Sequence, residues 1–262
     1  MTEKLLFDVH EAVATITLNN PEKLNAFDPD MLDGYFARLE ECRTREDINV
    51  IILTGSGRGF CSGGDTGGMG RGSQPSAKHA KDNLQNMIQR IPLKLMEIDK
   101  PVLAGVNGVA VGAGMDLALQ CDLRYAAESA RFAETYVRMG LVPGNGAAWF
   151  LPRIVGVPKA LEMLWTADFV NAAQAKELGI VQDVFPDEGF IGKVQEVGAR
   201  IAGQAPISVR YIKRLVQQGQ TMDLRTHLDL VSSHMVIART SEDHAEAIDA
   251  YRAKRTPKFK GS

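Results

Sequence analysis

Two short apolar runs, each followed by a glycine-rich loop, constrain the fold of this chain most strongly. They are residues 50–54, which are rich in β-branched side chains, and residues 101–106. Neither run alternates apolar with polar residues, which is typical of parallel strands that are buried on both faces. The loop after the second run continues into an apolar helix, expected over residues 112–120. This pattern predicts an α/β fold built on a parallel sheet.

The N-terminal third of the chain adds a hairpin and a capped helix to this core. Apolar residues alternate through residues 6–18 and predict a hairpin with His10 and Glu11 at its turn. Asp28 followed by Pro29 is typical of a helix N-cap with proline in the first turn. Residues 55–72 are so dense in glycine that we expect no regular structure there.

The remaining chain predicts a change from an alternating to a helical pattern. We expect a polar helix over residues 77–91 and a third buried strand over residues 122–126. After Pro186 the pattern is almost wholly helical, with breaks near Pro206 and Thr221. We therefore expect two parts, a core of residues 1–195 and a helical region of residues 196–262.

Composition excludes several classes of protein. The 262 residues carry a formal net charge of −2, which argues against nucleic acid as a main partner. Three widely spaced cysteines give neither a zinc motif nor a disulfide framework, and they suggest a reducing compartment. The sequence shows no apolar run of about 18 residues and no signal-peptide pattern at its start. We expect a cytoplasmic protein with no metal, nucleic-acid or membrane partner.

Chemistry is concentrated in the two glycine-rich loops, residues 58–65 and 107–116. Small residues let a ligand approach the backbone, and free N–H groups at a helix start favour negative charge. Two such groups directed at one oxygen would form an oxyanion hole. The alternative is that both loops are tight turns of the sheet. The second loop matches neither the GxGxxG dinucleotide fingerprint nor the phosphate loop that ends in Gly-Lys-Ser/Thr.

The order and spacing of five segments resemble the crotonase (enoyl-CoA hydratase/isomerase) superfamily over essentially the whole chain. The segments are PEKLNAF, RGFCSGGD, GVNGVAVGAGMDLALQCDLRYA, FAETYVRMGLVPGNGAAWFLPRIVG and AAQAKELGIVQDVFP. The resemblance implies a spiral of ββα turns in two nearly perpendicular sheets. It also implies C-terminal helices that assemble a homotrimer or a dimer of trimers. The implied substrates are acyl-coenzyme A thioesters, with coenzyme A as part of the substrate and no separate cofactor.

The resemblance also assigns site residues. An enolate-like intermediate would be held by the backbone N–H groups of Ser62 and Ala113, and Asp116 and Tyr136 would be the catalytic side chains. Alanine keeps the N–H that glycine often supplies at position 113, provided that the backbone needs no positive φ. The residues implied to line the adenine end of coenzyme A are Lys23, Leu24, Ala26, Gly63, Gly64, Asp65 and Thr66.

The acid/base positions depart from the pattern of the family. Hydratases of the family place a glutamate at each of the positions that Asp116 and Tyr136 occupy here, so the two-glutamate pair is not intact. Asp116 also matches an aspartate of the dienoyl-CoA isomerases, whose further carboxylates would stand at Tyr136 and Gly144. Hydration or isomerisation of a double bond is the first expectation. Hydrolysis or decarboxylation of an acyl-CoA, and acyl-CoA binding without catalysis, remain open.

Four further features have two interpretations each. Glu134 shares the face of Tyr136 in an extended segment, and a structural or interface salt bridge is favoured over a place in the pocket. Asp65 is either a ligand contact or a turn cap, and Asn145 either reaches the acyl group or serves its turn. The basic residues 251–260 either face the phosphates of coenzyme A or form a solvated tail. Residues 66–73 are predicted to form a mobile cover over the acyl site.

Overall fold

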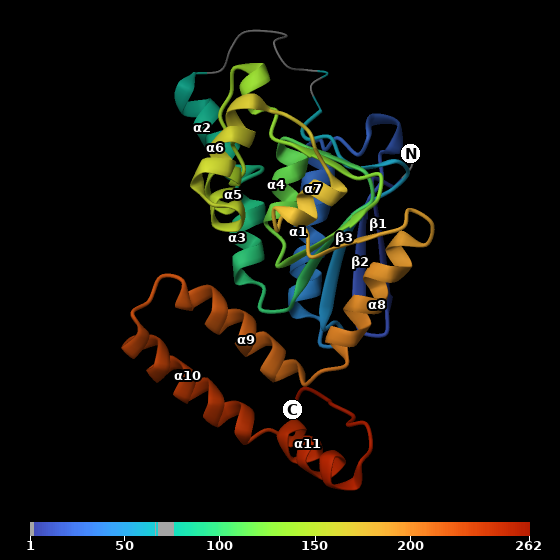
Figure 1. The fold of residues 1–262 in the computed structure, drawn as a ribbon, viewed down its shortest axis with the longest axis vertical. Helices are drawn as coiled ribbons and strands as arrows, with labels where there is room; N and C mark the ends of the chain where they lie inside the picture. The colour runs from blue at the N-terminus through green and yellow to red at the C-terminus, as the bar shows by residue number, and fades with distance from the viewer. Residues whose placement is uncertain (1–2, 66, 68–75) are drawn as a thin grey trace.

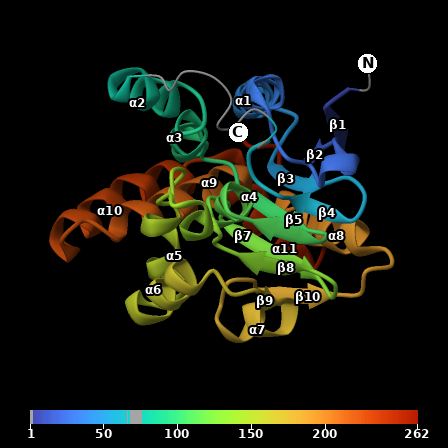
Figure 2. The same cartoon turned by 90° about the horizontal axis from the view of Figure 1, so that it is seen from above.

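The computed structural model describes residues 3–65, 67 and 76–262, which form two β-sheets with helices around them (Figures 1 and 2). The larger sheet has six strands in the order β1-β2-β3-β5-β7-β10. These strands are β1 (Leu5–His10), β2 (Val13–Leu18), β3 (Val50–Gly55), β5 (Val102–Val106), β7 (Leu123–Ala127) and β10 (Asp183–Phe185). From β2 onwards all of its neighbours pair in parallel. The predicted α/β class is confirmed.

The smaller sheet has four strands in the order β4-β6-β8-β9. They are β4 (Gly59–Cys61), β6 (Val109–Val111), β8 (Arg131–Ala133) and β9 (Val170–Asn171). Strand β4 lies inside residues 55–72, so the prediction that this stretch lacks regular structure is wrong. The strand forms because β6, which lies about fifty residues later, supplies the partner for Gly59 and Cys61. Such pairing is invisible to a local reading of glycine content.

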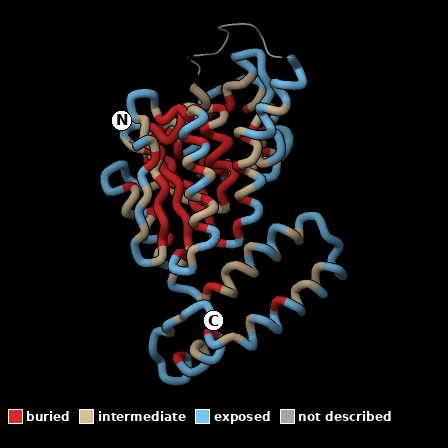
Figure 3. Tube along the Cα trace, turned by 180° about the vertical axis from the view of Figure 1, so that it is seen from behind, coloured by how far each residue is buried: buried red, intermediate tan, exposed pale blue. Residues whose placement is uncertain are grey.

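Strand β3 shows why the apolar runs are continuous. Ile51 and Leu53 belong to a core cluster that also contains residues of α1 (Pro29–Thr44). Val50 and Ile52 belong to a second cluster that contains residues of α8 (Phe190–Ala202). The sheet is thus covered on both faces, and its strands form the buried centre of the molecule (Figure 3).

Local signals predict most element boundaries correctly. The first hairpin is present, with Glu11 and Ala12 at its turn at φ 49° and 61°, one residue later than expected. Asp28 caps α1 by accepting a hydrogen bond from the Met31 N–H at 3.0 Å. The single helix expected over residues 77–91 is instead α2 (Ala77–Asn86) and α3 (Arg90–Glu97). Pro92 explains the break, since its ring excludes a helical carbonyl four residues earlier.

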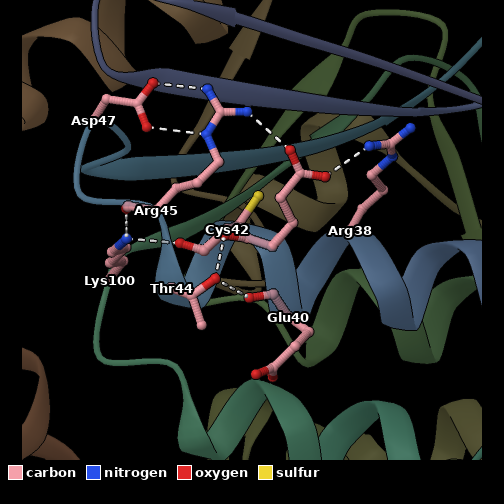
Figure 4. A network of polar contacts seen from close by, with 8 residues as sticks. Arg38, Glu40, Cys42, Thr44, Arg45, Asp47 and Lys100 are labelled. Carbon is pink, nitrogen blue, oxygen red and sulfur yellow. Dashed lines mark hydrogen bonds and ion pairs between the residues drawn. The ribbon is translucent and has the colours of Figure 1, made fainter.

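The end of α1 is closed by a buried lysine (Figure 4). Lys100 is 2 % exposed, and its ammonium group donates to the carbonyl oxygens of Cys42 at 2.6 Å and Arg45 at 2.5 Å. Helix C-termini leave such carbonyls without intrahelical partners and attract positive charge. Burial lowers the pKa of Lys100. Lys100, which lies just before β5, therefore supplies hydrogen bonds to carbonyl oxygens at the end of α1.

The C-terminal region is helical, as predicted, and consists of α9 (Pro206–Gly219), α10 (Leu224–Arg239) and α11 (Glu242–Ala253). Helices α9 and α10 pair and extend away from the sheets (Figure 1). The predicted boundary at residues 195 and 196 falls inside α8, which packs on β2, β3 and β5. Among the described residues, no helix has both the length and the apolar character to cross a membrane.

Candidate active site

The first glycine-rich loop is bound by backbone hydrogen bonds to the segment that follows η1 (Pro21–Lys23). Ser62 N–H donates to Leu24 O, and Phe27 N–H donates to Gly63 O, both at 2.9 Å. Asp65 N–H returns a third bond to Phe27 O at 2.9 Å. The structure therefore brings together the two segments that were predicted to line the adenine end of coenzyme A. Of those seven residues, Thr66 lies outside the described residues.

Side chains reinforce the same contact. Lys23 Nζ lies 2.6 Å from Asp65 Oδ2, and Asp65 Oδ1 accepts a bond from Gly67 N–H at 2.9 Å. Asn25 is fully buried, and its amide donates to Ser56 O and Gly59 O at 2.9 and 2.7 Å. The turn-cap interpretation of Asp65 is confirmed by its bond to Gly67. Its contact with coenzyme A stays a prediction.

Two glycines, Gly112 and Gly114, set the conformation of the second loop where α4 (Ala113–Leu119) begins. Gly112 has φ 52°, and its N–H donates to Ala133 O at 2.8 Å. A Cβ on Gly114 would lie 2.0 Å from Cys61 O, so only glycine lets α4 dock against the end of β4. Ala113 itself has no positive φ, which meets the condition for its predicted role.

The two loops converge at the start of α4. A Cβ placed on Gly63 would lie 3.6 Å from Ala113 N. Within the described part of the chain, neither Ala113 N–H nor Gly64 N–H has a hydrogen-bond partner. Ser62 N–H, in contrast, is occupied by Leu24 O. The prediction that Ser62 offers a free N–H is therefore wrong, because the tie between the loop and the preceding segment consumes it. Among the described residues, Gly64 N–H rather than Ser62 N–H is thus the donor of this loop without a partner.

Asp116 and Tyr136 lie in direct contact. Asp116 is in the first turn of α4 and has no exposed surface, while Tyr136 begins the short helix η3 (Tyr136–Met139). Tyr136 Oη donates to Asp116 Oδ2 at 2.5 Å. The structure thus joins the two predicted catalytic side chains, and the phenol hydrogen points at the carboxylate.

Burial dominates the electrostatics of this pair. It raises the pKa of Asp116 to about 7, although the Tyr136 hydrogen bond and the backbone N–H groups of Ala147 and Asn145 lower it. Those two N–H groups stand at the start of α5 (Ala147–Val155), and neither forms a bond of normal geometry with Oδ1. The pKa of Tyr136 is raised by burial and by the charge and hydrogen bond of Asp116. Asp116 is therefore the group of the pair that titrates near neutral pH.

Glu134 is a second buried carboxyl group in this neighbourhood. It is 1 % exposed, and neither of its oxygens has a hydrogen-bond partner among the described residues. It forms no ion pair with a described residue, so a salt bridge within the described chain is wrong, and a salt bridge across a subunit interface stays a prediction. Burial and the charge of Asp116 raise the pKa of Glu134 well above its usual value. Its spacing of two residues from Tyr136 was the sequence signal.

Two buried amides complete the polar cluster. Gln120 follows Asp116 by one helical turn, and its Nε2 donates to Asn145 O at 2.8 Å. Gln120 Oε1 and both side-chain polar atoms of Asn145 are buried without a partner among the described residues. Sequence analysis overlooked Gln120, although its spacing of four from Asp116 places both on one face of the helix. Buried polar atoms without partners indicate that a ligand or water belongs among them.

The remaining candidate features are a metal site, the basic C-terminal segment and the cover over the acyl site. No group of three or more His, Cys, Asp or Glu side chains within the described ranges could hold a metal ion. The C-terminal basic segment folds back on α11, where Arg255 pairs with Glu246 at 2.6 Å and Gly261 N–H donates to Asp243 at 2.9 Å. Phosphate binding by that segment stays a prediction. The expected cover over residues 66–73 falls almost wholly outside the described residues.

Comparisons with known proteins show the family to which the chain belongs. A family model described as "Enoyl-CoA hydratase/isomerase" matches residues 8–262. The chain is 36 % identical to 1,2-epoxyphenylacetyl-CoA isomerase of Escherichia coli over the full length of both. It is 32 % identical to 2,3-dehydroadipyl-CoA hydratase of the same organism, over 98 % of this chain and 99 % of that one. The crystal structure of an enoyl-CoA hydratase from Bacillus anthracis superposes with a TM-score of 0.93 at 31 % identity, covering 99 % and 100 % of the two chains.

Proposed function

The chain belongs to the enoyl-CoA hydratase/isomerase family and acts on the double bonds of acyl-CoA thioesters, and from this premise we propose the role of each group in its site. The thioester carbonyl oxygen lies between the N–H groups of Gly64 and Ala113. Negative charge develops on this oxygen when a proton leaves the adjacent carbon. Two preorganised donors, one in the loop after β4 and one at the N-terminus of α4, stabilise that charge. The observation that carries the proposal is that these two neighbouring N–H groups have no hydrogen-bond partner among the described residues.

Asp116 is the base that removes a proton from the carbon next to the thioester. A catalytic base works best when its pKa is near the operating pH, and the pKa of Asp116 is about 7. Tyr136 is a positioning residue in this scheme, because its hydrogen bond orients Asp116 and its high pKa keeps its proton in place. We therefore favour isomerisation, the shift of a double bond from the 3,4 to the 2,3 position, as the reaction.

Hydration is the second candidate, and a separate observation favours it. Gln120 Oε1, the carboxyl oxygens of Glu134 and the Asn145 amide are buried without partners among the described residues. Such a cluster is suited to hold an ordered water, which needs two to four polar partners. A water held there would be the nucleophile that adds to the 2,3 double bond.

Coenzyme A is held as part of the substrate, without a separate cofactor. The ribbon formed by residues 23–27 and 62–65 supports this assignment, since its backbone groups and the Lys23–Asp65 pair lie beside Gly64. We assign its adenine end to this ribbon. A cytoplasmic location accords with three buried cysteines that are all free thiols.

The paired helices α9 and α10 support the proposed trimer or dimer of trimers. Several of their large apolar side chains are exposed in the single chain, and patches of this kind mark interfaces. These residues include Ile212, Val216, Leu228, Met235, Val236 and Ile237. Light scattering measures the state directly. A mass of one chain, unchanged with concentration, would contradict the assembly.

A panel of thioesters in deuterated water tests the reaction. The panel contains crotonyl-CoA, a 3-enoyl-CoA, a 3-oxoacyl-CoA and methylmalonyl-CoA, with products followed by mass spectrometry. Conversion of the 3-enoyl-CoA to the 2-enoyl-CoA, lost in Asp116→Asn, is expected. A gain of water by crotonyl-CoA would favour hydration instead. Cleavage of the 3-oxo or methylmalonyl thioester, with both enoyl substrates unchanged, would contradict the assignment.

A further inference from the structure

Glu134 has a buried carboxyl group that nothing in the described part of the chain satisfies. Both of its oxygens are shielded from solvent and lack hydrogen-bond partners there. An ionised carboxylate in such a place loses its hydration without compensation, so the group keeps its proton instead. Glu134 is therefore a neutral carboxylic acid whose O–H is directed at no described protein group.

The groups around Glu134 place the negative charge on its neighbour. Tyr136 from η3 donates its hydrogen bond to Asp116 rather than to Glu134. The N–H groups at the start of α5 also act on Asp116 of α4. Two nearby buried carboxyl groups cannot both ionise easily, and these contacts decide which of them does. The pair thus consists of a carboxylate at Asp116 and an acid at Glu134.

The backbone places Glu134 beside the loop that carries the Ala113 N–H. Gly112 N–H bonds to Ala133 O, the residue before Glu134. A Cβ on Gly112 would lie 3.3 Å from Thr135 Oγ1, the residue after it. The segment that carries Glu134 is therefore packed against the start of α4. A substrate held by Ala113 N–H has Asp116 and Glu134 on the two elements that meet there.

We infer that Glu134 is the general acid of the site, which supplies the proton that the substrate gains while Asp116 accepts the one it loses. This inference rests on the proposed function, and it gives the chain a second carboxyl group that position 136 does not provide. Pairs of titratable groups whose surroundings favour opposite protonation states divide acid and base roles in this way.

The proton inventory of the isomerisation closes. Asp116 takes the proton from C2 of a 3-enoyl thioester, and the C2–H electron pair forms a dienolate whose charge rests on the thioester oxygen. The thioester carbonyl then re-forms, and the C1–C2 π pair of the dienolate becomes the C2–C3 double bond. The former C3–C4 π pair forms a bond to the proton of Glu134 at C4. Asp116 then holds one proton and Glu134 none. Transfer of that proton from Asp116 to Glu134 restores the starting state.

Glu134→Gln tests the inference, because glutamine keeps the size and neutrality of the acid but cannot release a proton. In deuterated water with a 3-enoyl-CoA, we expect deuterium to enter C2 at a rate within about threefold of wild type. Conversion to the 2-enoyl-CoA should fall by about 100-fold or more, the usual contribution of a general acid. Asp116→Asn should lose both exchange and conversion. Glu128→Gln, the same change at an exposed glutamate between β7 and β8, is the matched control.

Infrared spectroscopy gives a readout that does not depend on turnover. At about pH 8, where Asp116 is mostly ionised, wild type should show a protonated-carboxyl band that Glu134→Gln lacks and Glu128→Gln retains. Absence of that band, or wild-type conversion by Glu134→Gln, would overturn the inference while leaving the proposed function intact. Loss of exchange together with conversion in Glu134→Gln, with a lowered melting temperature, would show a structural role instead. Wild type that neither exchanges nor converts any thioester would contradict the proposed function itself.

Discussion

The phenol of Tyr136 and the carboxylate of Asp116 form one hydrogen-bonded unit, with Oη and Oδ2 2.5 Å apart. The bond lowers the pKa of Asp116 and thereby opposes the effect of burial. Tyr136 in η3 consequently lowers the pKa of a carboxyl group in α4. The first two predictions below concern this pair. The other two concern the docking of α4 at Gly114 and the end of α1 at Lys100.

Removal of the Tyr136 hydroxyl should shift the acidic limb of the kcat/KM profile to higher pH. In Tyr136→Phe the carboxylate of Asp116 loses the bond that favours its charged form, so its pKa rises above the value of about 7 in wild type. The acidic limb of kcat/KM shifts to higher pH, and kcat/KM near pH 7 falls roughly tenfold. A full pH series for both proteins checks the shift. An equal loss at every pH, with no displaced limb, would argue that Tyr136 acts in some other way.

Asp116 should make the fold less stable as pH rises. Its pKa is about 7 in the folded chain against 3.8 as the ordinary value, so the folded state holds the proton more tightly. The contribution of Asp116 to stability is complete below about pH 4 and is lost as pH rises to about 7. Asp116→Asn should therefore be more stable than wild type at pH 8, by on the order of 4 kcal/mol. Urea unfolding at several pH values measures this difference, and equal curves at pH 8 would refute it.

A methyl group on Gly114 should disturb the free Ala113 N–H. The Cβ of Gly114→Ala would lie 2.0 Å from Cys61 O, so α4 must move away from β4. We expect destabilisation of about 1–3 kcal/mol and a fall in kcat of about 100-fold, the usual effect of losing one oxyanion donor. Gly192→Ala in α8 is the matched control, because a Cβ there meets nothing within 4 Å. Gly192→Ala should stabilise the chain by up to about 1 kcal/mol. Similar effects from both changes would contradict the role of close approach at Gly114.

Loss of the Lys100 ammonium should destabilise the end of α1. Lys100→Met keeps much of the side-chain volume but leaves the carbonyls of Cys42 and Arg45 without their donor. The expected loss is about 1–3 kcal/mol, since buried acceptors are left unpaired. Lys193→Met, which removes an exposed lysine paired with Glu196, should change stability by about 0.5 kcal/mol or less. Guanidinium unfolding compares the two. A loss at Lys100 no greater than at Lys193 would count against the capping role.

Much of the fold could be predicted from the sequence because its signals are local. The continuous apolar run at β3, the Asp28–Pro29 cap and the glycine-led start of α4 each depend on neighbouring residues. The order of motifs then predicted the family. The hairpin turn was off by one residue, which lies within the ordinary uncertainty of element ends.

The details that sequence analysis missed depend on residues far apart in the chain. Ser62 N–H is occupied by Leu24 O, which lies almost forty residues earlier, and no local pattern reveals that bond. Strand β4 exists because β6 pairs with it. The spacing of Glu134 from Tyr136 shows that the two share a face, but only the fold shows that Glu134 is enclosed close to Asp116.

The backbone bonds between residues 24–27 and the first glycine-rich loop also bear on the speed of catalysis. These bonds, and the close docking of Gly114 on Cys61, hold Gly64 and Ala113 in place. The conformational entropy of aligning the two donors is therefore lost once, when the protein folds, and not again at every turnover. If the thioester carbonyl binds as proposed, its two donors are already held in place, and the chemical step requires little rearrangement of the backbone around the carbonyl.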